Sequence, residues 1–417
     1  MYNKYITLLK FAFLSKYLAS DPTLIAKCKE YCDYLGLGNP WLFGKFFMEL
    51  LTYSHSRENS SQHFLDVSQI PPKLVDDYTF SRNGSVKKAD KNISITFEII
   101  PKPFYKLFEI YPMVLDYNYF QYAIDQGFFF NFYQKTSLKS SDRFKKYEDF
   151  KGYIGLHFFE QFLVKKYIEA IFYRVGQKVI STERYQDFIV KSAAKNILIF
   201  EVKMADLHAN AIEKMDFAAF IDFIDNSFLS TKEVNGKNKG VSQVIKQVQH
   251  LAETNSELRE MLDIKSADCM NIYPIIIYSD TNLDIGGVNR YVNTTFQNRI
   301  HELGLKAHFQ SVKPLLMMNV NTLIECFALL KKSPLTLTDW INSYFKSVSG
   351  WEKRYSRENN AYVYFQLNRS FSAYMKSKLP PDVFDSNLRE TRRSFDLDIV
   401  DFGKDLPNES NNLENER

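Results

Sequence analysis

The strand-like run NILIFEVK, residues 196–203, contains the two charged side chains best placed for chemistry. With a period of two residues, Glu201 and Lys203 lie on one face of this strand, and the other face is apolar. The preceding run RYQDFIV, residues 184–190, places Asp187 among apolar and aromatic residues. A short turn would pair the two runs as a hairpin. We therefore expect Asp187 and Glu201 to lie side by side.

Two neighbouring carboxylates inside a protein need a cation. Charges in buried strands are costly unless paired or metal-bound, and two close carboxylates repel until one takes up a proton. Oxygen ligands without a nearby Cys or His favour Mg²⁺ or Mn²⁺ over zinc. We expect Asp187 and Glu201 to hold this ion, and Lys203 to orient a water and stabilise charge on a phosphate. An exposed Glu-x-Lys pair beside an unrelated aspartate remains the alternative.

A helix predicted over residues 155–172 adds a third carboxylate. Glu160 precedes Leu163, Val164, Tyr167 and other apolar residues at helical spacing, so it lies on the buried stripe and needs a partner. The carboxylate pair with its metal could supply that partner. Glu169 points about half a turn away and is expected to be exposed.

A second helix, predicted over residues 241–252, has the apolar stripe Val241, Val244, Ile245 and Val248. Gln243, Lys246 and Gln247 share another face, which suits contacts with phosphate or water. An exposed glutamine without a role is the alternative reading for Gln243.

In the order helix Glu, strand Asp, strand Glu-x-Lys and helix Gln, the chain resembles the PD-(D/E)XK restriction-endonuclease-like superfamily. The resemblance covers roughly residues 150–330 and lies in the runs GLHFFE, RYQDFIV, ILIFEVK and KGVSQV; IYPIIIYSD is similar to the strand that follows the Gln helix in many members. Gln186 stands where the motif has proline. The resemblance implies an αβββαβ core, metal at Asp187 and Glu201, and Lys203 assisting the attacking water. It also gives Glu160 and Gln243 supporting roles.

The function that this resemblance implies is a Mg²⁺- or Mn²⁺-dependent endonuclease, a phosphodiester hydrolase acting on DNA and leaving 5′-phosphates. Restriction or antiviral defence is the setting that the family suggests, with a regulatory or sensor protein as a further partner and a homo-oligomer left open. The alternative is a catalytically inactive nuclease-fold subunit that acts as a nucleic-acid-binding or scaffold protein.

Lysines around the expected site could hold the DNA backbone. Lys191 and Lys195 fall in the predicted strand turn, Lys237 and Lys239 in the loop EVNGKNKG, and Lys246 on the Gln helix. A loop whose lysines are merely solvated is the alternative.

The wider pattern predicts an α/β nuclease core flanked by helical parts. A mostly helical N-terminal domain with some strand is expected over 1–150, the core over 151–330, a helical C-terminal extension over 331–394, and an acidic disordered tail over 395–417. Expected elements are three helices within 1–54, strands near 92–100, 177–182, 185–190, 197–203 and 271–278, helices near 155–172, 205–228, 241–252 and 291–303, a strand pair near 307–319, and helices to about 378.

Composition sets the outer limits of this interpretation. The 417 residues are 45% apolar and 24% charged with a net charge of +4, and because the last 23 residues hold seven acidic and two basic side chains, the first 394 carry about +9. No run reaches the ~18–20 apolar residues of a membrane span. Lys10 and Lys16 interrupt what would be a signal peptide, and four scattered cysteines suit free thiols. A cytoplasmic protein without membrane contact is expected.

Overall fold

The computed structural model describes residues 4–56, 67–68, 70–80, 100–108, 111–182, 185–193, 195–207, 211, 216–229, 240–358, 360–380 and 383–397. The chain forms two compact units, one of residues 1–158 with 396–417, and one of residues 159–395. The division falls inside a continuous helical run over 147–171 rather than in the polar stretch before it. The strand expected near 92–100 and most of the acidic tail lie outside the described residues.

Unit 1 is mostly helical in the part that the structure describes. The helices expected within the first 54 residues are present, and the first helix buries Ile6, Leu9, Phe13 and Tyr17, which repeat at helical spacing. Strands β1 and β2 pair in parallel and β2 and β3 antiparallel. The elements are α1 (Lys4–Ser20), α2 (Ile25–Leu35), α3 (Pro40–Ser56), α4 (Pro72–Asp77), β1 (Thr79–Phe80), β2 (Phe104–Phe108), β3 (Tyr111–Val114), α5 (Tyr117–Ile124), α6 (Gln126–Lys135), the 3₁₀ turn η2 (Ser137–Ser140) and α7 (Tyr147–Tyr153).

Aromatic rings build the core of unit 1, which accounts for part of the chain's high aromatic content. Phe43 stacks on Phe47 at 4.7 Å and meets Phe128 and Tyr78 edge-on at 5.2 and 5.5 Å. Edge-to-face ring pairs add stability beyond the area that they bury.

Unit 2 is built on a mixed sheet. Among the described residues the sheet has six strands in the order β4-β5-β6-β7-β8, and β9 also pairs with β7. The elements are the π-helical η3 (Ile154–Val164), shared with unit 1, then α8 (Lys165–Ile171), β4 (Lys178–Thr182), β5 (Tyr185–Ala193), β6 (Asn196–Lys203), α10 (Phe217–Ile224), the π-helical η4 (Asp225–Leu229), α11 (Val241–Ala252), α12 (Glu257–Met261), β7 (Asn271–Tyr278), η5 (Thr281–Asp284), α13 (Val288–Glu302), η6 (Leu305–His308), β8 (Ser311–Val312), β9 (Leu316–Asn319), α14 (Val320–Glu325), α15 (Phe327–Lys332), α16 (Leu335–Tyr355), α17 (Ala361–Asn368), α18 (Phe371–Lys376) and α19 (Val383–Phe395).

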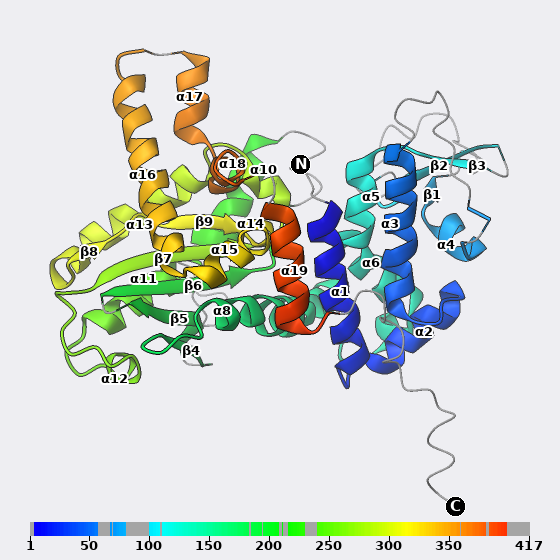
Figure 1. Ribbon diagram of the computed structural model, residues 1–417, viewed down its shortest axis with the longest axis horizontal. Helices are drawn as coiled ribbons and strands as arrows, with labels where there is room; N and C mark the ends of the chain where they lie inside the picture. The colour runs from blue at the N-terminus through cyan, green and yellow to red at the C-terminus, as the bar shows by residue number, and fades with distance from the viewer. Residues whose placement is uncertain are drawn as a thin grey trace, which may run out of the picture. The chain divides into compact units, whose positions relative to one another are not determined.

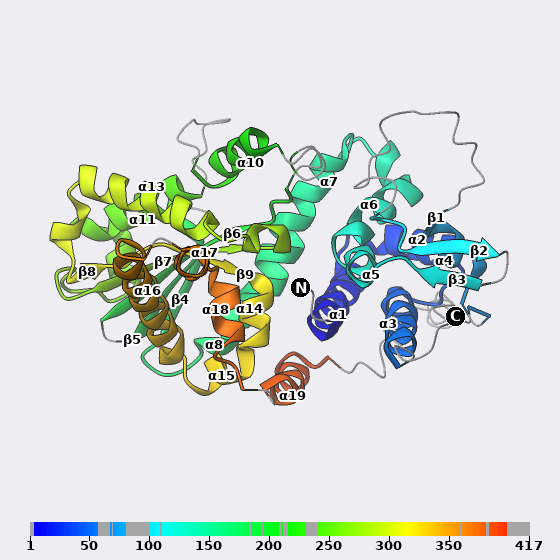
Figure 2. The same ribbon diagram turned by 90° about the horizontal axis from the view of Figure 1, so that it is seen from above.

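Strands β4, β5 and β6 form an antiparallel meander, and β6 then pairs in parallel with β7 across the helix α11. Helices cover both faces: α10, α11 and α13 lie on one side of the sheet and α8, α15 and α19 on the other (Figures 1 and 2). Because both faces are covered, the central strands are mostly apolar, and the charged Glu201 and Lys203 near the end of β6 are exceptions. The mixed α/β class predicted from the sequence is confirmed.

Several predicted elements differ in detail. Of the helix expected over 205–228, residues 205–207 are not helical, whereas Ala211 and the helix α10 are. The two strands near 307–319 each pair in parallel with β7 rather than with each other, and residues 305–308 form the 3₁₀ turn η6 instead. In the part of the chain that is described, no helix is both long and apolar enough to cross a bilayer.

Candidate functional site

The hairpin of β5 and β6 brings the two predicted strand carboxylates together. Phe188 pairs with Phe200, and continuing this register by one residue sets Asp187 opposite Glu201. The Val202 amide donates a hydrogen bond to Asp187 Oδ2. The expectation that the two residues lie on adjacent strands is therefore confirmed.

Burial of the hairpin on both faces forces the charged side chains inward. Ile189 and Ile199 belong to the core shared with α11, whereas Phe200 on the other face lies beside Phe172 at the end of α8. Glu201 follows in the same strand and is completely buried, with 0% of its surface exposed. A carboxyl at this position loses its hydration and must find protein or ligand partners.

Lys203 supplies the one cationic partner that Glu201 has among the described residues. The two side chains lie two residues apart on one face of β6 and form an ion pair. Apart from this ammonium, neither carboxyl oxygen of Glu201 has a hydrogen-bond partner in the described part of the chain. Burial raises the pKa of Glu201 to about 8, although the Lys203 charge opposes the rise. Burial lowers the pKa of Lys203, but the surrounding carboxylates outweigh it and leave the pKa raised.

Glu160 joins the site from the π-helical segment η3. It is half-buried, shares a hydrogen bond with Asp187 and accepts another from the Gln161 amide. Burial and the nearby Asp187 charge raise the pKa of Glu160 to about 7. Burial also raises the pKa of Asp187, partly offset by Lys203 and the Val202 amide. Glu160 therefore faces the strand carboxyls, whereas Glu169 is exposed as predicted.

Gln243 holds the other side of Lys203 from the first turn of α11. Its Oε1 accepts hydrogen bonds from Lys203 Nζ and from the Gly240 amide, each at 3.0 Å. Gly240 has φ of +55°, and a Cβ there would lie 2.2 Å from the carbonyl oxygen of Phe228. Only glycine fits this position without a backbone shift, so Gly240 fixes where α11 begins and hence where Gln243 points.

Three carboxyl groups therefore surround one ammonium at the end of the β5–β6 hairpin. This cluster of carboxyl groups, with Glu201 oxygens that have no hydrogen-bond partner in the described chain, suits a hard divalent cation that would displace the protons. Within the described ranges, no three His, Cys, Asp or Glu side chains form a group that could hold a metal ion. An ion bound here would take two carboxylates from the protein and keep several waters, as Mg²⁺ commonly does.

Sequence reasoning missed polar residues at the carboxyl end of β7. Tyr278 pairs with Lys203, and the Ser279 amide donates to the Lys203 carbonyl oxygen at 3.3 Å. The Ser279 hydroxyl is buried and has no hydrogen-bond partner among the described residues. The signal was available, because Ser279 and Asp280 follow an apolar strand that must end at the same sheet edge as Lys203.

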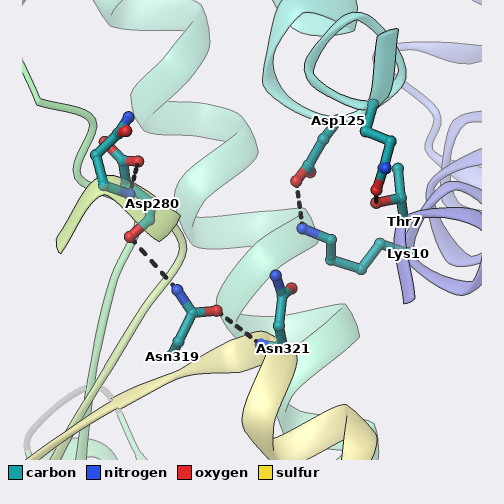
Figure 3. Close-up of polar contacts among 8 residues, drawn as sticks. Thr7, Lys10, Asp125, Asp280, Asn319 and Asn321 are labelled. Atoms are coloured by element: carbon teal, nitrogen blue, oxygen red, sulfur yellow. Dashed lines mark hydrogen bonds and ion pairs between the residues drawn. The ribbon is translucent and has the colours of Figure 1, made fainter. Parts of the chain in front are cut away.

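Asp280 ties together the segments that leave this edge. Its carboxylate accepts hydrogen bonds from the amides of Leu207 and Asn282, both at 2.8 Å. The Asn319 side chain at the end of β9 donates to the Asp280 carbonyl and accepts from the Asn321 amide (Figure 3). Asp280 thus holds the segment that follows Lys203.

Gln247, one turn after Gln243, corrects another expectation. The sequence predicts Gln247 on a face suited to contacts with phosphate or water, but the side chain is 1% exposed, and its Oε1 has no hydrogen-bond partner among the described residues. The helix buries more of its circumference than its apolar stripe indicates, because α12 and α13 pack against it in addition to the sheet.

The lysines predicted to hold DNA do not flank the site together. Lys191 lies inside β5 rather than in the turn, and its ammonium donates to the carbonyls of Leu262 and Asp263 at 2.9 Å. Lys195 occupies the turn at the far end of β6, roughly 20 Å of strand away from Glu201. The turn is shorter than expected, since Ala193 already pairs with Asn196, and this moves both lysines away.

Lys246 is exposed one turn after Gln243, so it stays near the site. Lys237 and Lys239 lie outside the described residues.

Comparison with known proteins identified no relative of this chain. No protein-family model matches the chain, and no curated protein or solved structure is significantly similar to it.

Proposed function

We propose that the chain is a divalent-metal-dependent endonuclease that hydrolyses phosphodiester bonds of DNA. The observation that carries this proposal is the pair of Asp187 and the fully buried Glu201, with Lys203 paired to Glu201. Glu160 and Gln243 complete the cluster from two helices. Assignment to the PD-(D/E)XK superfamily is supported by the succession of helix, three strands, helix and parallel strand around these residues.

The chemistry of these residues fits a metal ion, because the available ligands are carboxylate oxygens. In the described chain, the Glu201 oxygens have no partner except the Lys203 ammonium. Asp187 and Glu201 would hold Mg²⁺ or Mn²⁺, which when bound supplies a Lewis acid beside the scissile phosphate.

Side chains of the protein would position the water, stabilise the phosphate charge and transfer protons. Lys203 would orient the attacking water and stabilise charge on the phosphate oxygens, and Gln243 keeps its ammonium in place. Glu160, with a pKa of about 7, can hold or release a proton near neutral pH. Water attacks phosphorus and the bond to the 3′ oxygen breaks, which leaves a 5′-phosphate.

Cleavage of labelled DNA by the purified full chain tests the proposal. We expect cutting with Mg²⁺ or Mn²⁺ and none with EDTA. Asp187→Ala and Lys203→Ala should each lower the rate at least about a hundredfold, as expected when an electrostatic group of a site is lost. Glu169→Gln, an exposed carboxyl on the same helical run as Glu160, is the matched control and should cut normally.

Calorimetry with Mn²⁺ measures metal binding and so distinguishes metal ligands from residues that act on the water or the phosphate. Asp187→Ala and Glu201→Gln should lose binding, whereas Lys203→Ala should retain it. Wild-type cutting by both alanine variants would refute the proposal. DNA binding without any metal-dependent cutting would favour the inactive nuclease-fold alternative, for which the pairing of Lys203 with Glu201 is the supporting observation.

A further inference from the structure

The helical hairpin of α16 and α17 projects from unit 2 and exposes several aromatic rings. The two helices run side by side, as both views show (Figures 1 and 2). Val363 and Leu367 of α17 are buried, so the rest of this short helix faces outward. Tyr362, Tyr364 and Phe365 are 61%, 55% and 60% exposed. Large rings in a contiguous exposed patch mark an interaction site more often than scattered ones do.

Contacts across the hairpin hold two of these rings in place. Tyr362 meets Trp351 of α16 edge-on, and Tyr364 lies against Tyr355, each with ring centroids 5.8 Å apart. The Arg354 guanidinium lies over the Trp351 ring at 5.3 Å. The rings are thus preordered, and a ligand that stacks on them would lose little side-chain freedom.

The charge around the rings is cationic. Glu352 pairs with Arg290 and Glu358 with Arg354, both at 2.9 Å. Lys353 and Arg357 are exposed on the same turns and have no acidic partner among the residues that the structure describes, so this end of the hairpin carries more basic than acidic side chains.

The base of the hairpin lies at the sheet edge that carries the candidate site. The Gly287 amide, at the start of α13, donates to the Asn368 carbonyl at the end of α17 at 2.8 Å. The following helix α18 contacts β9 and also η5, which follows the carboxyl end of β7. Lys203 ends β6 at this same edge, opposite Tyr278.

We propose that the α16–α17 hairpin binds single-stranded DNA and delivers it to the candidate site; the delivery step rests on the proposed nuclease function. Exposed rings beside cationic groups fit a strand whose bases are unstacked and whose phosphates are accessible. A duplex keeps its bases stacked and offers the rings nothing to stack on. A second copy of the chain fits less well, because a symmetric contact through this patch would bring the cationic groups together.

Fluorescence anisotropy with the full chain in EDTA tests the proposal without cleavage. The probes are a labelled 20-nucleotide single strand, the same sequence as a duplex, and its RNA counterpart. Wild type should prefer the DNA single strand. Tyr362→Ala combined with Phe365→Ala should weaken that binding about tenfold or more, as expected for lost base stacking. Tyr173→Ala, an equally exposed ring at 63%, is the matched control and should bind as wild type.

Lys353→Glu with Arg357→Glu should lower the salt slope of single-strand binding by about one to two units. Lys265→Glu with Lys306→Glu makes the same charge change at exposed positions elsewhere in unit 2 and should leave the slope unchanged. Circular dichroism should show that every variant is folded.

Unchanged affinity of the ring variant, an equal loss in the control variants, or tighter binding of duplex or RNA would overturn the proposal. Loss of a dimer in the ring variant, measured by light scattering, would identify a second copy as the occupant instead and also overturn it. The two proposals fail separately: ring-dependent binding without any cutting by wild type would refute only the nuclease, whereas cutting with ring-independent binding would refute only the DNA-binding hairpin.

Discussion

Glu201 shows how much of the candidate site can be predicted from single residues of the sequence. A carboxylate that ends an apolar strand is costly, and this cost predicted a partner for it. Lys203 and Asp187 were found by the same reasoning. The prediction did not include Gln247, whose burial depends on packing of α12 and α13 that no local pattern encodes. It also did not include Ser279, although its place directly after an apolar strand was a usable signal.

The raised pKa values of Glu160 and Glu201 predict an unusual pH dependence of stability in the metal-free protein. Between the ordinary pKa near 4.5 and the folded values of about 7 and 8, the folded state keeps protons that the unfolded chain has released. The free energy of unfolding should therefore fall as pH rises through this range, by about 1.4 kcal/mol per pH unit for each such carboxyl.

Glu201→Gln cannot titrate and should flatten this slope. Urea unfolding in EDTA at pH 5.5, 6.5 and 7.5 measures the difference. With each step up in pH, the free energy of unfolding of Glu201→Gln should rise relative to that of wild type. Glu169→Gln, whose carboxyl is exposed, should show the same pH dependence as wild type. Parallel curves for wild type and Glu201→Gln would show that Glu201 keeps no proton in the folded state.

At the scale of elements, the alternation of apolar and polar residues with a period of two predicted the positions of the strands well. The hairpin of β5 and β6, the strand β7 and the helix α11 lie where alternation and helical spacing predicted them. Helical spacing did not reveal that η3 is π-helical, because the wider turn depends on packing. The turn of the hairpin was predicted too early, since Lys191 resembles a loop residue until its carbonyl partners Leu262 and Asp263, just after α12, are known.

The start of α11 provides a prediction at this scale. Gly240→Ala adds a methyl group that meets the Phe228 backbone and also disfavours the positive φ. The start of the helix must then shift, which moves Gln243 away from Lys203. We expect a loss of roughly 1–3 kcal/mol in stability and a lower rate of cleavage with metal binding retained. Thermal unfolding and the cleavage assay measure the two effects.

Gly152→Ala is the control for this substitution, because a Cβ at Gly152 would have nothing within 4 Å. If Gly240→Ala were as stable and as active as wild type, α11 would tolerate a shifted start and Gln243 would need no fixed geometry.

At the scale of the whole molecule, the two compact units have separate cores, aromatic in unit 1 and aliphatic around the sheet in unit 2. The change from a helical pattern to alternating helices and strands predicted two kinds of structure. It could not locate the division at residue 158, because the helical run over 147–171 continues across it and contains no loop to mark a boundary.

A buried ion pair in unit 1 tests whether the units are energetically separate. Lys10 of α1 pairs with Asp125 between α5 and α6, and both side chains are largely buried (Figure 3). Lys10→Met leaves Asp125 buried without its cation, which should cost about 3–5 kcal/mol. Lys45→Met, which removes an exposed ion pair with Glu49, should cost less than about 1 kcal/mol.

Hydrogen exchange by peptide locates the effect of Lys10→Met. Peptides from 4–20 and 117–135 should exchange faster in this variant, whereas peptides from 185–203 should be unchanged. Mn²⁺ affinity should also be unchanged, because Asp187 and Glu201 lie in the other core. Faster exchange throughout both units would mean that they unfold as one cooperative body, and the site in unit 2 would then depend on the aromatic core of unit 1 for its stability.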